Sequence, residues 1–281
     1  MKKNYDLVFG LGGACSCAQT IRAANLQFLS FPNDWCGPDL RDYAGQVVQH
    51  DICSRAESLL NDFEGCFNPE DFEQQTVFGN VIRQFNRKTG CVFSHDFPPD
   101  IPIAQSMPAV REKYRRRTQR ILGLVEKAKR ILIVRIERPD FIVRTTLEDC
   151  QTVREMFLSR FPGRQFDFAL FSYEKGRSLA DRKEEQVTDW LFRVTYDYRD
   201  YSEKTDPKVT MVSQNARILS NHFSVCDYRT PDEIRRHREL RLQKKLAKHA
   251  RSNKILYWLT RARLGLMRLF SFSASAKTSA P

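Results

Sequence analysis

The stretch "LVFGLGGACSCAQTIRAANL" at residues 7–26 decides the fold, because an apolar strand pattern changes there into a helical pattern across a cluster of glycines. Residues 5–9, "YDLVF", predict a short buried strand that ends at these glycines. The apolar spacing from Cys15 onward predicts a helix. A strand that turns directly into a helix indicates an α/β protein, and it places Cys15 at the start of the helix.

Helices and apolar strands alternate along much of the remaining chain. A charged helix over residues 110–130 leads into the strand "ILIVRIE", a helix over 145–161 leads into the strand "QFDFALFSY", and a further strand follows at "WLFRVTYDY". The pattern predicts an α/β fold with a central, mostly parallel or mixed sheet flanked by helices. Residues 39–88 are expected to be mainly helical and loop-like.

The net charge of +12 is concentrated at the C-terminal end of the chain. Residues 229–281 hold fourteen Lys or Arg and three acidic residues, whereas residues 1–228 hold 32 basic and 31 acidic residues. We therefore predict one main domain over residues 1–228 and a basic helical tail over residues 229–281.

Residues 253–272 of the tail have apolar side chains on one helical face and basic side chains on the other. A basic amphipathic helix of this kind suits an anionic membrane surface or a groove on a partner protein. Nucleic acid is not expected as a partner, because the basic residues are confined to the tail and no recognised reader motif accompanies them.

The eight cysteines include no CxxC pair and show no repeated spacing, which favours reduced thiols in a cytosolic protein over disulfides or structural zinc. No metal or cofactor is predicted. The longest plausible apolar run, "ILIV" at 131–134, is far too short to span a membrane. The N-terminus imitates a lipoprotein signal, but Asp6 interrupts its apolar region. We expect a cytoplasmic protein whose tail allows peripheral attachment to the inner face of the membrane.

Cys15 is the cysteine whose predicted position suits a nucleophile. A thiol attacks as the thiolate, and free N–H groups at a helix start stabilise negative charge on a nearby sulfur. The same N–H groups could form an oxyanion hole when a carbonyl is attacked. Cys17 would point to a different helical face and is interpreted as a packing residue.

A cysteine nucleophile needs a base, and His95 in "CVFSHDF" is the candidate, because a strand end provides a rigid platform. The other four histidines lie in the basic tail or in polar surroundings. Either Asp34 or Asp96 could orient the His95 ring. Adjacent residues of a regular strand point to opposite faces, which favours Asp34, whereas a break at Pro98 would allow Asp96.

Three short motifs carry a resemblance to a known family. They are G-x-x-C-x-x-A followed by "IR" (Gly12, Cys15, Ala18, Ile21, Arg22), S-x-P-x-D-W (Ser30, Pro32, Asp34, Trp35) and "HDF" at 95–97. Together with the arginine-rich helix that leads into "ILIVRIE", they resemble a bacterial family of papain-like cysteine peptidases over residues 5–138. The resemblance implies a cysteine peptidase or a related thiol-dependent hydrolase or acyltransferase, with Cys15 as nucleophile, His95 as base and an unknown peptide or acyl substrate.

Two other functions are compatible with the sequence. Gly10–Gly13 satisfies two glycines of the dinucleotide-binding pattern G-x-G-x-x-G, so a nucleotide or sugar-phosphate site is one alternative, with Asp34 as the ribose-binding acid. A non-catalytic assembly protein that attaches to the membrane surface through its tail is the other.

Overall fold

A computed structural model describes residues 2–13, 15–38, 42–43, 46–47, 51–77, 81–93, 95–98, 100–137, 144–197, 210–252 and 261. The chain divides into two compact units, Met1–Asp227 and Tyr228–Pro281. The helices are α1 (Cys15–Ala23), α2 (Ile52–Leu60), α3 (Ile103–Lys127), α4 (Leu147–Arg160), α5 (Met211–His222) and α6 (Pro231–Ser252), with 3-10 helices η1 (Pro32–Asp34) and η2 (Pro69–Asp71). The strands are β1 (Lys3–Tyr5), β2 (Leu7–Gly10), β3 (Cys36–Pro38), β4 (Asp42–Tyr43), β5 (Gln46–Val47), β6 (Phe72–Val77), β7 (Val81–Asn86), β8 (Cys91–Phe93), β9 (Arg130–Ile136), β10 (Gln165–Tyr173), β11 (Lys183–Gln186), β12 (Leu191–Tyr196) and β13 (Phe223–Val225).

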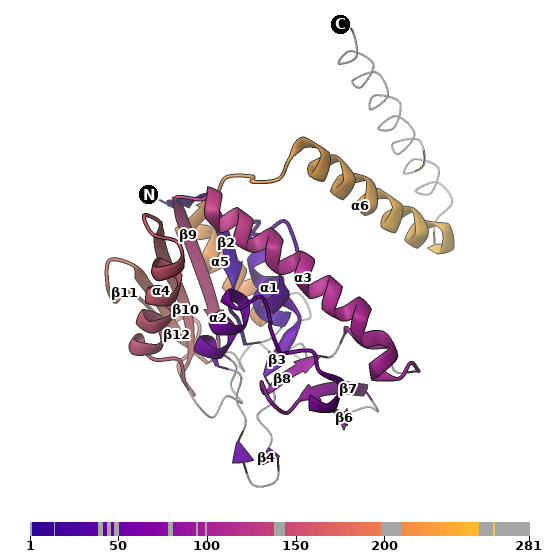
Figure 1. The fold of residues 1–281 in the computed structure, drawn as a ribbon. Helices are drawn as coiled ribbons and strands as arrows, with labels where there is room; N and C mark the ends of the chain where they lie inside the picture. Colours follow the sequence, from indigo (N-terminus) through magenta and orange to yellow (C-terminus); the bar gives the residue numbers. More distant parts are fainter. Residues whose placement is uncertain are drawn as a thin grey trace, which may run out of the picture. The chain divides into compact units, whose positions relative to one another are not determined.

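The central sheet of the first unit has the strand order β11-β12-β10-β9-β2 (Figure 1). Strands β2, β9, β10 and β12 are parallel, and β11 is an antiparallel edge strand. Strand β1 precedes β2 and pairs in parallel with β13. Asp6 separates β1 from β2, and its carboxylate accepts hydrogen bonds of 2.9 Å from the backbone N–H groups of Lys129 and Arg130. The predicted α/β class with a mostly parallel sheet is confirmed.

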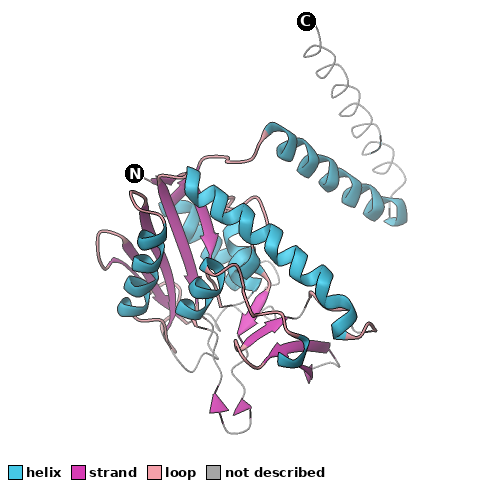
Figure 2. Cartoon of the chain, viewed as in Figure 1, coloured by secondary structure: helices cyan, strands magenta, loops and turns pink. Residues whose placement is uncertain are grey.

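Helices cover both faces of this sheet (Figure 2). One face buries side chains of β2, β9, β10 and β12 against α1 and α5, with Ile21 and Leu219 fully buried in the same apolar cluster. On the other face Phe9 of β2 contacts Phe157 of α4, with ring centroids 5.9 Å apart. Burial on both faces explains why the parallel strands read as continuous apolar runs rather than as alternating patterns.

A second, antiparallel sheet has the strand order β3-β8-β7-β6. The expectation of mainly helix and loop over residues 39–88 is therefore wrong for residues 72–77 and 81–86, where β6 and β7 pair as antiparallel strands. Glutamines at three of the strand positions weaken the apolar signal of this strand pair. Its pairing is supported instead by aromatic contacts of Phe93 in β8, whose ring centroid lies 5.6 Å from those of both Phe72 and Tyr114.

The other predicted elements of the first unit are confirmed, with shifted ends. Helix α3 begins at Ile103, seven residues before the predicted start at Val110, and it contains Pro108 in its interior, where the missing N–H leaves the Ala104 carbonyl without its usual i+4 donor. Helix α4 begins after Thr146, whose hydroxyl accepts a hydrogen bond of 3.0 Å from the Asp149 N–H.

The second unit contains the basic helix α6. The amphipathic segment predicted over residues 253–272 lies outside the described residues, apart from Arg261. None of the helices in the described ranges combines the length and apolar character that a membrane span requires.

A truncated chain that ends at Asp227 is expected to unfold at the same melting temperature as the first unit does in the full-length protein. Next to this end, the Cys226 N–H donates a hydrogen bond of 3.1 Å to the Tyr5 carbonyl. A chain that ends at Thr210 is the control, and it should unfold because α5 contributes Ala216 and Leu219 to the core. Thermal unfolding followed by circular dichroism measures both, and a clear loss of stability on ending at Asp227 would contradict the prediction.

Candidate active site

Cys15 is the first residue of α1 and follows the loop at the carboxyl end of β2. Its side chain is half-buried, and the first turn of α1 contains no acidic residue. The first N–H groups of a helix have no intrahelical partner, so the positive end of α1 is available beside the sulfur. This placement agrees with the one predicted from the sequence.

The glycine loop that precedes Cys15 is bonded to β9. The Leu11 N–H donates to the Val134 carbonyl at 3.0 Å, and the Gly13 N–H donates to the Ile136 carbonyl at 3.4 Å. The buried guanidinium of Arg135, a residue of β9, donates a further hydrogen bond of 2.9 Å to the Leu11 carbonyl. A phosphate-binding loop needs free N–H groups, so this arrangement argues against the nucleotide alternative.

Gly10 and Gly12 serve the packing of α1 on the strand end. A Cβ atom at Gly12 would lie 2.0 Å from Cys17 Cβ and 2.4 Å from Cys17 Sγ, and one at Gly10 would lie 3.0 Å from the same sulfur. Cys17 is fully buried there, and its thiol contacts the Val134 carbonyl at 3.6 Å. The two glycines therefore set how closely α1 approaches the sheet, which is a packing role, and Cys17 is a packing residue as predicted.

Gly12→Ala is expected to destabilise the protein by about 3 kcal/mol or more, because an overpacked site must shift α1 or the loop. Gly123→Ala in α3 is the matched control, since no atom lies within 4 Å of the added Cβ. That control should stabilise the helix by about 1 kcal/mol, the difference in helix propensity between alanine and glycine. Urea denaturation measures both, and equal effects of the two substitutions would refute the packing role.

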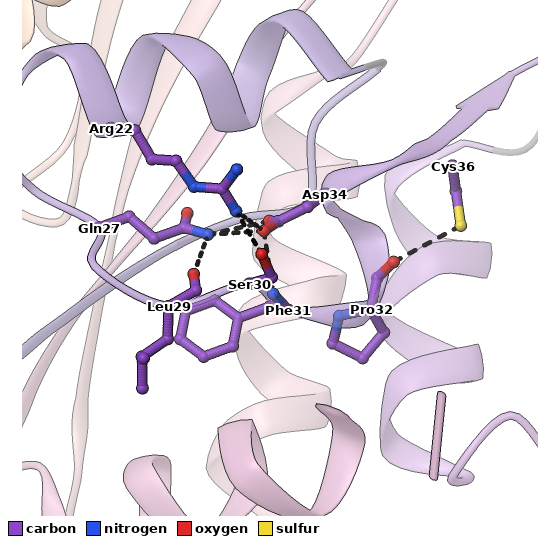
Figure 3. A network of polar contacts seen from close by, with 8 residues as sticks. All are labelled: Arg22, Gln27, Leu29, Ser30, Phe31, Pro32, Asp34 and Cys36. Carbon is purple, nitrogen blue, oxygen red and sulfur yellow. Dashed lines mark hydrogen bonds and ion pairs between the residues drawn. The ribbon is translucent and has the colours of Figure 1, made fainter. Parts of the chain in front are cut away.

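Asp34 lies in a buried polar network (Figure 3). Its carboxylate pairs with the Arg22 guanidinium and accepts hydrogen bonds from Gln27 Nε2 at 2.8 and 3.0 Å and from the Phe31 N–H at 2.9 Å. Burial raises the pKa of Asp34, and the Arg22 charge and the hydrogen bonds from Gln27 and Phe31 oppose that shift. Arg22 also donates to Ser30 Oγ at 3.1 Å. The network joins α1 to η1.

His95 lies against the Trp35 ring. The two ring centroids are 5.8 Å apart at an interplanar angle of 87°, an edge-to-face contact. The Arg22 guanidinium lies over the same indole, 5.3 Å from its centroid. Arg22 is seven residues after Cys15, so it lies on the same face of α1, about 10 Å further along the helix axis. His95 is exposed and is connected to α1 through Trp35 and Arg22.

Asp96 lies beyond the end of β8, in a bend, so the argument from strand alternation against it does not apply. Its carboxylate accepts a hydrogen bond of 3.1 Å from the Tyr114 hydroxyl and pairs with Lys113 Nζ at 2.5 Å. The described contacts of Asp34 and Asp96 are thus with other residues than His95. Asp34 pairs with Arg22 and His95 contacts Trp35, so the two residues are linked through the Arg22–Trp35 contact.

Several of the other cysteines have shifted pKa values. Burial raises the pKa of Cys17 and Cys150 to about 12 and that of Cys53 to about 11. Cys36 is fully buried, and a hydrogen bond from the Cys91 thiol lowers its pKa. All eight cysteines, which belong to the described part of the chain, are unpaired. In the same part of the chain, no group of three or more His, Cys, Asp or Glu side chains could hold a metal ion.

A family model described as "Putative papain-like cysteine peptidase (DUF1796)" matches residues 6–176. The chain belongs to the DUF1796 family. The DUF1796 match extends beyond the three motifs, through α4 and β10, and ends before the basic tail. The family expected from the motifs is confirmed.

One relative is a protein of Acanthamoeba polyphaga mimivirus described as uncharacterized. It is 25% identical over 164 residues, which cover 52% of this chain and 69% of the viral one. Because this relative is viral, the bacterial origin expected from the motifs stays a prediction. No solved structure matches this DUF1796 chain.

Sequence reasoning did not assign a role to Trp35, Arg135 or Tyr114. Arg135 carried a signal, since it is the one charged residue inside the apolar run "ILIVRI", and a buried charge requires partners. Trp35 belongs to the S-x-P-x-D-W motif, but no pattern in the sequence predicts its contact with His95, and none predicts the hydrogen bond from Tyr114 to Asp96.

Arg22→Ala is expected to destabilise the protein by about 3 kcal/mol, because it leaves the Asp34 carboxylate buried without its counter-ion. Asp34→Asn should lower the free energy of unfolding by less. It leaves Arg22 unpaired, whose side chain is 28% exposed and can be hydrated, whereas the Asp34 side chain is 0% exposed. Denaturant unfolding at pH 7 compares the two variants. A larger effect of Asp34→Asn would show that the network does not depend on the buried charge.

Proposed function

We propose that this protein is a thiol-dependent hydrolase or acyltransferase in which Cys15 is the nucleophile. The observation that carries the proposal is the position of Cys15. Its half-buried thiol lies at the start of α1, directly after a loop that is hydrogen-bonded to β9 and to the Arg135 side chain. The family description, which names papain-like cysteine peptidases, supports a hydrolase.

In the proposed reaction the Cys15 thiol transfers its proton to the His95 imidazole, and the sulfur forms a bond to the carbonyl carbon of an amide, ester or thioester. N–H groups of the first turn of α1 donate to the carbonyl oxygen as it becomes negatively charged. The bond to the leaving group then breaks, and the leaving group takes the proton from His95. Cys15 stays acylated. Water or an acceptor amine then attacks the thioester and releases the thiol.

Asp34 and Asp96 act in this proposal by different routes. Asp34 positions Arg22, which stacks on Trp35, and Trp35 in turn restricts the His95 ring through its edge-to-face contact. Asp96 is the neighbour of His95 in sequence and is anchored by Tyr114 and Lys113. Asp34 is therefore a positioning residue, and Asp96 fixes the backbone next to the base.

The test is the alkylation rate of each cysteine by iodoacetamide between pH 6 and 9, followed by mass spectrometry. Cys15 is expected to react fastest, and His95→Ala should slow it on the order of tenfold by removing the base. Cys53 should react slowly, because a pKa of about 11 leaves roughly one thiolate in a thousand at pH 8, a fraction that rises tenfold per pH unit. Cys36 is fully buried and should react only on unfolding.

His222→Ala is the matched control for His95→Ala, because His222 pairs with Glu184 on the surface far along the chain from the site. It should leave the rate at Cys15 unchanged. The second readout is acylation by 4-nitrophenyl acetate, which should modify wild-type protein and not Cys15→Ser. A Cys15 that reacts no faster than the exposed Cys226, with or without His95, would sink the proposal.

A further inference from the structure

One flank of α3 lies beside the candidate active site. Lys113, Arg117 and Arg120 follow one another at spacings of four and three residues, so they lie within about 60° of one another around the helix axis. Lys113 Nζ pairs at 2.5 Å with the carboxylate of Asp96, the residue that follows His95. This flank of α3 is therefore next to the segment that carries the proposed base.

The same flank reaches the buried Arg22–Asp34 pair. Helix α3 contacts η1, the 3-10 helix that ends at Asp34. Burial raises the pKa of Asp34, and the charges of Arg22 and Arg117 both oppose that shift, so the Arg117 guanidinium lies near the pair. Arg22 also lies over the Trp35 ring, which contacts His95. Cations of α1 and α3 therefore lie near one buried carboxylate, beside the Trp35–His95 contact.

Together these side chains form a cationic cluster of four residues: Arg22, Lys113, Arg117 and Arg120. Arg22 is paired with Asp34, and Lys113 is paired with Asp96. In the part of the chain that the structure describes, no carboxylate pairs with Arg117 or Arg120. Four positive and two negative charges leave the cluster with a net charge of +2.

Arg117 and Arg120 offer hydrogen-bond donors to an anion. Arg117 is half-buried, and its Nη1 is shielded from solvent without a hydrogen-bond partner, whereas buried polar groups normally have one. Arg120, one turn further along α3, is exposed. A guanidinium binds a carboxylate through two parallel hydrogen bonds, and the attraction is stronger where the site is partly shielded from water. The pair therefore suits a carboxylate that approaches from solvent.

The cluster lies within electrostatic range of Cys15. Arg22 is seven residues after Cys15 on the same face of α1, about 10 Å along the helix axis. The Debye length is about 10 Å at 0.1 M ionic strength and about 30 Å at 0.01 M. A charged group several bonds away from a carbonyl carbon at Cys15 is therefore attracted to the cluster.

We propose that the substrate of the Cys15 site carries a carboxylate and that Arg117 and Arg120 bind it. The substrate is then an acidic peptide or an acyl chain with a carboxylate at its far end, and the two arginines are specificity-determining residues. A site of one charge sign attracts substrates of the opposite sign and discriminates against neutral ones. The inference rests on the proposed thiol chemistry, because it assigns the substrate class of that same site.

Two 4-nitrophenyl esters of equal chain length test the proposal on the full-length protein. Mono-4-nitrophenyl glutarate ends in a carboxylate, and 4-nitrophenyl valerate ends in a methyl group. The acylation rate of Cys15 is measured with each ester at an ionic strength of about 0.01 M, with Cys15→Ser as the background. The glutarate-to-valerate ratio of rates should be about tenfold higher for Cys15 than for N-acetylcysteinamide, a neutral free thiol.

Salt and three variants assign this ratio to the cluster. At about 1 M KCl, where the Debye length is about 3 Å, the ratio should fall toward that of the free thiol. Arg117→Gln and Arg120→Gln should each lower the ratio about threefold at low salt, which corresponds to one partly exposed ion pair. Arg115→Gln is the matched control, because Arg115 lies on the opposite side of α3 and is bonded to Glu112 at 2.7 and 2.9 Å. It should leave the ratio unchanged.

A ratio at Cys15 equal to that of the free thiol overturns the inference, and so does a raised ratio that Arg117→Gln and Arg120→Gln both leave unchanged. In those two outcomes both esters still acylate Cys15, so the proposed function stands. Acylation by neither ester overturns the proposed function, and the inference fails with it. Because Arg120 is exposed and the salt series uses the wild-type protein, the test stays decisive even where Arg117→Gln perturbs the fold.

Discussion

The close approach of α1 to the end of β2 is the constraint on which the rest of the site depends. Because Gly12 has no Cβ, Cys17 can occupy space that a Cβ at position 12 would overlap. The N–H groups of the neighbouring Leu11 and Gly13 are hydrogen-bonded to β9. With Cys17 buried and the loop held by hydrogen bonds, the first turn of α1 is fixed, and the half-buried Cys15 is its first residue. A reactive group next to a short loop that is held by hydrogen bonds loses little conformational entropy when it binds a substrate.

The Arg22–Asp34 pair extends that constraint from α1 to the second sheet. Arg22 bonds the buried carboxylate with one end of its guanidinium and lies over Trp35, which contacts His95. A planar guanidinium can do both at once, because it is weakly hydrated and can stack on an aromatic face while donating in its own plane. The positions of α1, η1 and the segment after β8 are therefore coupled, although they are far apart in the sequence.

Tyr114 has a comparable role on the other side of the second sheet. Its ring packs against Phe63, Phe67 and Phe93, and its hydroxyl bonds Asp96 and Cys36. One side chain of α3 thus supports both the segment that carries His95 and the loop that follows α2. The desolvated hydroxyl and carboxylate are tolerated because each has a hydrogen-bond partner and Lys113 balances the charge.

The sequence by itself determined the strand, glycine loop and helix around Cys15, the parallel β9–β10 core and the charge division between body and tail, because these depend on local apolar periodicity and composition. It also indicated the family, since each motif is a short local stretch of sequence. Only the tertiary structure decided that β6 and β7 form strands, that Asp34 is bound by Arg22, and that His95 contacts Trp35. These features arise from side chains that meet across long sequence separations, and no local pattern specifies which partner a buried charge or an aromatic ring will find.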